Sequence, residues 1–254
     1  YLGAVSVLAP LAYERLDLVL AFLIALAVWL AWTDRPRFGA FCLGLAVAVK
    51  LTPLLLVPPL LFYVWNRRPA HRFKRSAAAV LSGLAGLAAG LIPFLIFYGT
   101  DSLSFLTYQA GRGVQIESVL SSGALIGHLV GMPAEVVREV RAFSLRFPHW
   151  RPILTVWTVL GVGALVALVV LCWRRRGQLT DSVAGRGRTV LWLALFLSAG
   201  IVVSKVFSPQ FLIWLFPLAP ILPAEGPRSR QPLILWGTVV FLTAVISFQY
   251  NRSL

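Results

Sequence analysis

Uninterrupted apolar segments limit how this chain can fold more than any other feature of its sequence. Residues 38–65, 76–98 and 152–173 are almost continuously apolar, and a helix across the hydrocarbon core of a bilayer needs about 20 such residues. Only 13% of the 254 residues are charged, against about a quarter in soluble domains. The runs also lack the alternation of membrane β-strands. The sequence therefore predicts an all-α polytopic membrane protein built as a helical bundle.

The charged residues predict how the chain crosses the membrane. Basic residues are concentrated in short connections between the apolar runs, at residues 35–37, 67–75, 174–188 and 228–230. Under the positive-inside rule these connections are cytoplasmic, and residues 13–17 and 99–151 lie outside. The net charge of +14 is then a topology signal, so no nucleic-acid partner is predicted.

The start of the chain bears on its domain organisation. Residue 1 is Tyr, and the opening apolar run of residues 1–12 is too short for a span and has no charged segment before it. We therefore expect residues 1–254 to be a single transmembrane domain from a larger protein, with a first helix and a first external loop missing upstream of Tyr1. The domain carries one large external loop, residues 99–151.

Two lysines interrupt apolar runs in a similar way. Lys50 is followed by Thr52 and Pro53, and Lys205 is followed by Ser208 and Pro209. Because proline disfavours a helical residue before it, and basic loops flank both runs, each run is predicted to be a hairpin of two short helices. The lysine lies at its outer turn.

The external loop has three predicted parts. A polar stretch at residues 108–118, here called the central loop, contains two glycines that let the backbone bend. Residues 119–130 are predicted to form a re-entrant or surface helix, and residues 133–146 an amphipathic helix on the membrane. Before the loop, Ser82, Gly86 and Gly90 recur every four residues, which predicts close helix packing.

The predicted topology brings several charges to the outer face. Lys50 and Lys205 lie at equivalent turns, and Arg112 lies in the central loop. A lysine near the bilayer usually has a partner, so the shared pattern favours an anion such as a lipid phosphate, which an arginine can bind with two hydrogen bonds. The alternative is that each lysine reaches lipid headgroups or pairs with Asp17 or Glu117.

Three segments carry a resemblance to a known family. They are Gly44-Leu-Ala-Val-Ala-Val-Lys-Leu-Thr-Pro53, Arg112-Gly-Val-Gln-Ile-Glu-Ser-Val119 and Ser204-Lys-Val-Phe-Ser-Pro-Gln-Phe-Leu-Ile-Trp214. In this order and spacing they resemble the polyprenol-phosphate-mannose-dependent α-mannosyltransferases of actinobacteria, glycosyltransferase family 87, which have the GT-C fold. Glu14-Arg-Leu-Asp17 is similar to an Arg-x-Asp patch in that family.

The resemblance implies an activity and roles for residues. The family transfers mannose, with inversion, from polyprenyl-phosphate-mannose to a glycolipid or lipoglycan acceptor on the outer side of the cell membrane. Its catalytic aspartate, the base, is expected upstream of Tyr1. The implied donor-phosphate ligands are Lys50, Arg112 and Lys205. The implied sugar- and acceptor-binding residues are Gln115, Glu117, Gln210, Asp17, Glu14, Arg15 and His128.

Some alternatives stay open at this point. Glu117 is a second candidate for the base, although a carboxylate beside Arg112 is expected to remain ionised and to position the sugar. A satisfied interfacial histidine is the alternative for His128. No residues have the spacing of a metal site, and no cofactor is expected. A lipid-linked sugar transporter or flippase and a non-catalytic membrane subunit are the alternative functions.

Overall fold

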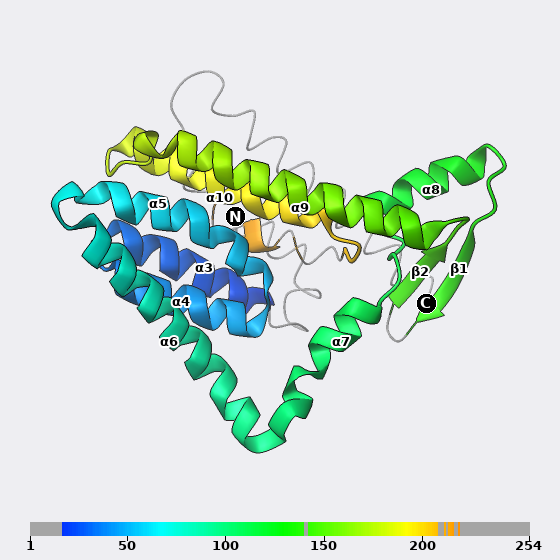
Figure 1. Ribbon diagram of the computed structural model, residues 1–254, viewed down its shortest axis with the longest axis horizontal. Helices are drawn as coiled ribbons and strands as arrows, with labels where there is room; N and C mark the ends of the chain where they lie inside the picture. The colour runs from blue at the N-terminus through cyan, green and yellow to red at the C-terminus, as the bar shows by residue number, and fades with distance from the viewer. Residues whose placement is uncertain (1–16, 140–141, 208–210, 212, 216–217, 219–254) are drawn as a thin grey trace. The chain divides into compact units, whose positions relative to one another are not determined.

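The computed structural model describes residues 17–139, 142–207, 211, 213–215 and 218 (Figure 1). The described residues divide into two compact units. The first contains those within 1–92, 171–197 and 209–254, and the second those within 93–170 and 198–208.

Helices make up most of the described chain. The α-helices are α3 (Asp17–Trp32), α4 (Pro36–Val49), α5 (Val57–Arg67), α6 (Arg72–Tyr98), α7 (Ser104–Gly111), α8 (Val119–Leu129), α9 (Trp150–Arg174) and α10 (Val183–Val203). Short 3₁₀ turns are η1 (Thr52–Leu56), η2 (Pro69–His71), η3 (Gly99–Leu103) and η4 (Arg176–Gln178). The strands are β1 (Glu135–Glu139) and β2 (Ala142–Arg146).

Within the described residues, three helical stretches are long and apolar enough to cross a membrane: Pro69–Leu103, Trp150–Arg174 and Val183–Val203. Helix α3 has 16 residues and belongs with α4 and α8 to the shorter apolar helices. These lengths confirm the predicted all-α membrane protein. The prediction that the chain is a single domain remains untested.

Small residues allow close helix packing in the first unit. A Cβ atom on Gly39 of α4 would lie 2.6 Å from the carbonyl oxygen of Ala27 in α3. On α6, a Cβ on Gly86 would collide with the carbonyl of Phe41, and one on Gly90 would collide with Ala48. The predicted small-residue stripe is therefore confirmed at Gly86 and Gly90, where α6 approaches α4.

The run around Lys50 folds as predicted. Helix α4 ends at Val49, and Lys50 is extended, with φ −151° and ψ 144°. Pro53 lies in the first turn of η1, and α5 then runs back in the direction opposite to α4 (Figure 1). The two helices and the turn at Lys50 are thus confirmed.

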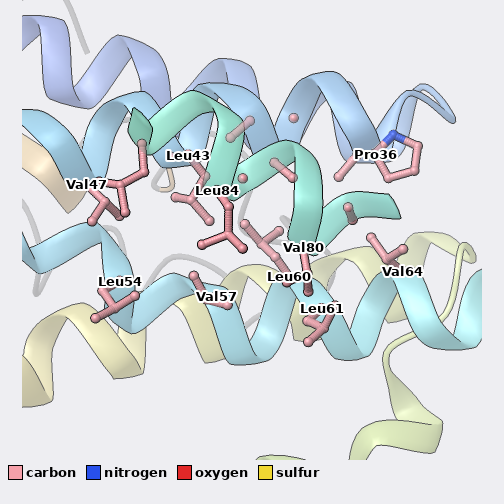
Figure 2. Close-up of a pocket in the computed structure, with 18 residues that line it drawn as sticks. Pro36, Leu43, Val47, Leu54, Val57, Leu60, Leu61, Val64, Val80 and Leu84 are labelled. Carbon is pink, nitrogen blue, oxygen red and sulfur yellow. The ribbon is translucent and has the colours of Figure 1, made fainter. Parts of the chain in front are cut away.

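A cavity of about 190 Å³ lies between α3, α4, α5 and α6 (Figure 2). Its wall is made of aliphatic side chains, alanines, glycines and one proline, with Leu43 and Val47 on α4 facing Leu60 on α5 and Leu84 on α6. Among the described residues, no charged or hydrogen-bonding side chain lines it. The cavity therefore suits hydrocarbon, and the polar chemistry of this protein must lie elsewhere.

Ion pairs join the basic connections of the first unit. Asp34 accepts hydrogen bonds from Arg68 and Arg75, and Arg67 forms an ion pair with Asp181 at 2.9 Å. Burial would raise the pKa of Asp34, but the hydrogen bond from Arg75 and the charges of the arginines hold it below its usual value. The connections that the sequence predicts on one face of the membrane are therefore in contact with one another.

The prediction of an amphipathic helix at residues 133–146 is wrong. Strands β1 and β2 form an antiparallel hairpin there, with Val136 opposite Leu145 and Val137 opposite Ser144. The physical reason is visible in the sequence, because adjacent β-branched valines favour strands. Phe143 and Leu145 also alternate with polar residues at the period of a strand.

Helix α8 confirms the helix predicted at residues 119–130. Ser118 is its N-cap, and the Ser118 side chain accepts a hydrogen bond from the backbone of Ser121 at 3.2 Å. Such a cap satisfies one of the backbone donors that a helix leaves unpaired at its start. The cap therefore fixes where the central loop ends and the helix begins.

Helix α10 ends just before the second lysine, as predicted. Its last residue is Val203, and the indole of Trp157 on α9 donates to the Val203 carbonyl at 3.0 Å. A Cβ on Gly161 would lie 2.8 Å from the Val203 side chain. This packing fixes the helix end from which Lys205 extends. Most of the predicted second half of this hairpin lies outside the described residues.

Candidate functional site

Lys205 is bonded to the central loop twice within the second unit. Its ammonium donates to the backbone carbonyl of Arg112 at 2.7 Å, and its own carbonyl accepts from the backbone N–H of Gln115 at 3.0 Å. Residues far apart in the sequence are therefore held together by one side-chain and one backbone contact. Two of the three predicted phosphate-binding cations, Arg112 and Lys205, are neighbours.

The β1–β2 hairpin also forms hydrogen bonds with the central loop. The N–H of Ile116 donates to the carbonyl of Phe143 at 3.0 Å, and the N–H of Leu145 donates to the carbonyl of Val114 at 2.8 Å. These bonds make Gln115 the bridge partner of Ser144 on β2. The central loop thus adds a short third segment to the edge of the hairpin.

A tight turn connects this segment to α8. The N–H of Ser118 donates to the carbonyl of Gln115 at 2.9 Å. The hydroxyl of Ser121 donates to the carbonyls of Ile116 at 2.5 Å and Ser118 at 2.8 Å. Gln115 and Ser118 are buried. The backbone of residues 114–118 is therefore fixed on both sides, which positions Glu117 within the turn.

Glu117 carries a buried carboxylate oxygen. Its Oε2 has no hydrogen-bond partner among the residues that the structure describes. Burial raises the pKa of Glu117, and its own backbone N–H and the charge of Arg112 lower it by less. Removal of the carboxylate from water therefore outweighs the charge of Arg112, and the expectation that Glu117 stays ionised and positions the sugar remains a prediction.

Arg112 is half-buried beside the loop. Its guanidinium lies 5.4 Å from the centre of the Tyr108 ring, within the range of a cation–π contact. The Tyr108 ring stabilises the position of the Arg112 guanidinium and leaves its positive charge in place. The central loop thus carries the planar guanidinium of Arg112 and is bonded to the ammonium of Lys205. This combination is suited to an anion with several oxygens.

Lys50 has a different environment, in the first unit. Its ammonium lies 2.6 Å from Oδ1 of Asp17, and the same oxygen accepts from Nε1 of Trp214 at 2.7 Å. The Lys50 nitrogen also lies 5.0 Å and 4.8 Å from the ring centres of Phe211 and Trp214. The geometry matches the alternative of an ion pair with Asp17, and a phosphate role for Lys50 stays a prediction.

The other predicted site residues are placed as follows. His128 is exposed near the end of α8, and its Nδ1 lies 2.8 Å from the carbonyl of Met132. A carbonyl only accepts, so Nδ1 carries the proton. Glu14, Arg15 and Gln210 lie outside the described residues.

Two residues of these clusters were missed by sequence reasoning. Trp214 donates a hydrogen bond to Asp17. The only sequence feature that could have indicated this role was its position at the end of the third family segment. Ser144 faces Gln115, and the strand period of residues 142–146 was the signal that could have found it. Across the described part of the chain, no three His, Cys, Asp or Glu residues are grouped as metal ligands.

These features define a class of protein: a polytopic helical membrane protein with a polar loop that gathers two cations and a buried carboxylate. The sequence profile of glycosyltransferase family 87 matches residues 2–209. The chain belongs to this family and is a membrane glycosyltransferase, which acts on a sugar donor and an acceptor in a lipid setting. No curated protein and no solved structure matches it.

Proposed function

We propose that this protein transfers mannose from polyprenyl-phosphate-mannose to a glycolipid or lipoglycan acceptor on the outer face of the cell membrane. The observation that carries the proposal is the double contact between Lys205 and the loop of Arg112 and Gln115. It joins two cations to a buried polar segment. A donor that combines a phosphate with a sugar needs both kinds of group close together.

The chemistry assigns the cations to the leaving group. The bond between the anomeric carbon and the carrier phosphate oxygen breaks, and the acceptor hydroxyl oxygen forms the new bond on the opposite face of the sugar. The carrier phosphate leaves as an anion, and fixed cations stabilise that developing charge better than water does. Arg112 binds two phosphate oxygens, and Lys205 supplies a second positive charge and holds the loop.

Glu117 is assigned to the sugar. A buried carboxylate oxygen is a strong acceptor for a sugar hydroxyl, and such a bond contributes more than a neutral one. Burial raises the pKa of Glu117 and makes it a stronger base than an ordinary glutamate, which keeps Glu117 as the second candidate for the base.

The experiment uses full-length protein in membranes with radiolabelled polyprenyl-phosphate-mannose and acceptor lipids. Arg112→Ala isolates the guanidinium, because Lys205 binds the backbone carbonyl of residue 112 and that contact survives the substitution. We expect transfer to fall by about 100-fold or more, with partial recovery in Arg112→Lys.

Lys74→Ala is the matched control, since Lys74 is an exposed cation at the start of α6. Its transfer rate should equal that of the wild type. Normal transfer by Arg112→Ala would refute the phosphate assignment, and transfer from another carrier sugar alone would refute mannose.

A further inference from the structure

Three unpaired polar atoms are grouped in the second unit. Among the described residues, six buried side-chain nitrogen or oxygen atoms have no hydrogen-bond partner. Three of these six are Oε1 of Gln115, Oε2 of Glu117 and Oγ of Ser144. Gln115 is 7% exposed and Ser144 is 1% exposed. All three belong to the central loop and the strand bonded to it.

The backbone pairing brings two of these side chains close together. The bonds on either side of Gln115 and Ser144 join Ile116 to Phe143 and Leu145 to Val114, so the pair itself exchanges no backbone bond. In an antiparallel ladder such a pair has the closer spacing, and both side chains point to the same face. Glu117 follows two residues later in the same rigid turn.

An unsatisfied buried polar group costs about 1–3 kcal/mol, so three such groups on adjoining segments indicate a bound ligand. Two of the atoms accept hydrogen bonds only, and the hydroxyl of Ser144 both donates and accepts. The complementary ligand presents several hydroxyl groups within a few ångströms. A hexose has this chemistry, whereas a phosphate has no hydroxyl array and an acyl chain has no donors.

We propose that Ser144, Gln115 and Glu117 form a site for the sugar hydroxyls of the donor, with the β-hairpin supplying Ser144 as a residue that determines sugar specificity. This inference rests on the proposed function and names the residues that bind the sugar. Arg112 and Lys205 then bind the carrier phosphate at the opposite end of the same loop segment.

The test separates the sugar from its carrier. Binding of polyprenyl-phosphate-mannose and of bare polyprenyl phosphate is measured on the full-length protein in nanodiscs, for wild type, Ser144→Ala and Gln115→Ala. Each substitution should weaken binding of the mannosyl carrier by about 5- to 10-fold, the worth of one hydrogen bond. Binding of the bare carrier should not change.

Ser76→Ala is the matched control, because Ser76 on α6 is also a buried serine whose hydroxyl has no partner among the described residues. It should bind both carriers as the wild type does. The melting temperature of ligand-free Ser144→Ala should equal or exceed that of the wild type, since its hydroxyl bonds to no described residue. A lower melting temperature with unchanged binding would assign Ser144 a structural role and overturn the proposal.

Polyprenyl phosphates carrying glucose or galactose distinguish this inference from the proposed function. If the wild type binds a carrier with another hexose in place of the mannosyl carrier, and Ser144→Ala weakens that binding, the hydroxyl site is supported and the mannose assignment is refuted. If the wild type binds no glycosylated carrier more tightly than the bare one, or if Ser144→Ala binds every carrier normally because water satisfies the hydroxyl, the site is refuted.

Discussion

At the scale of single residues, Asp17 is a carboxylate that is only 2% exposed, with two donors on one oxygen. Lys50 neutralises its charge, and the indole of Trp214 adds a hydrogen bond. A buried charge is tolerated only when it is paired and hydrogen-bonded. Lys50 therefore has a structural role, the pairing with Asp17 that the sequence left open as an alternative, and its replacement will affect the fold.

We predict that Lys50→Ala lowers the stability of the detergent-solubilised protein by about 1–3 kcal/mol, less than a fully buried pair would lose, because Lys50 is 35% exposed. The double variant Lys50→Ala with Asp17→Asn should recover part of that loss, since it no longer strands a charge. Thermal unfolding of the four proteins in the cycle measures both effects. Equal melting temperatures for Lys50→Ala and wild type would contradict the ion pair.

Glu117→Gln should change the pH dependence of stability. An acid whose pKa is raised by folding stabilises the fold below its unfolded pKa, and that stabilisation disappears as pH rises through the folded pKa. The burial of Glu117 raises its pKa above the ordinary 4.5, so the ionised side chain opposes folding near neutral pH. The variant should melt higher than wild type at about pH 7 and at the same temperature at about pH 4. Lower stability of the variant at neutral pH would be the opposite result.

At the scale of elements, helix packing depends on a few glycines. Helix α6 approaches α4 where Gly86 meets the carbonyl of Phe41, and backbone atoms cannot move aside as a flexible side chain would. Glycine alone permits this approach. Gly163 on α9 is not needed for close packing in this way, because a Cβ there would lie more than 4 Å from every neighbouring atom of the described residues.

We therefore expect Gly86→Ala to destabilise the protein by about 1–3 kcal/mol through overpacking. Gly163→Ala should be neutral or stabilising by up to about 1 kcal/mol, because alanine favours a helix over glycine. Melting temperatures in one detergent compare the two substitutions directly. A similar response at both positions would show that α6 and α4 are not in close contact.

At the scale of the whole molecule, the membrane topology is a prediction that cysteine labelling can test. Gly111 is exposed at the end of α7 and has open space around it, and Ala70 is exposed in η2. In a background without Cys42 and Cys172, an impermeant thiol reagent should label Gly111→Cys in intact cells. It should label Ala70→Cys only after the cells are opened. The reversed pattern would invert the topology.

Local sequence patterns were sufficient for much of the fold. Continuous apolar runs predicted the helices, since a backbone in lipid must satisfy its own hydrogen bonds. The lysine and proline positions predicted the end of α4 at Val49 and of α10 at Val203. The hairpin at residues 133–146 was misassigned because its charged residues suggested an amphipathic helix, although its valines and its period favoured strands.

The candidate site could be predicted only in part. The sequence singled out Arg112, Gln115, Glu117 and both lysines, because polar residues are conspicuous in an apolar chain. It could not choose their partners, since Lys50 and Lys205 have similar sequence contexts and yet one binds Asp17 and the other the carbonyl of Arg112.

By itself, the sequence determined that this chain is a helical membrane protein with a polar central loop, because hydrophobicity and charge act locally along the chain. Tertiary structure alone decided that Lys205 and β2 hold the central loop, and that Ser144 lies opposite Gln115. These contacts join residues about 30 to 90 positions apart, and hydrogen bonds over such separations depend on how the helix ends and the hairpin come together.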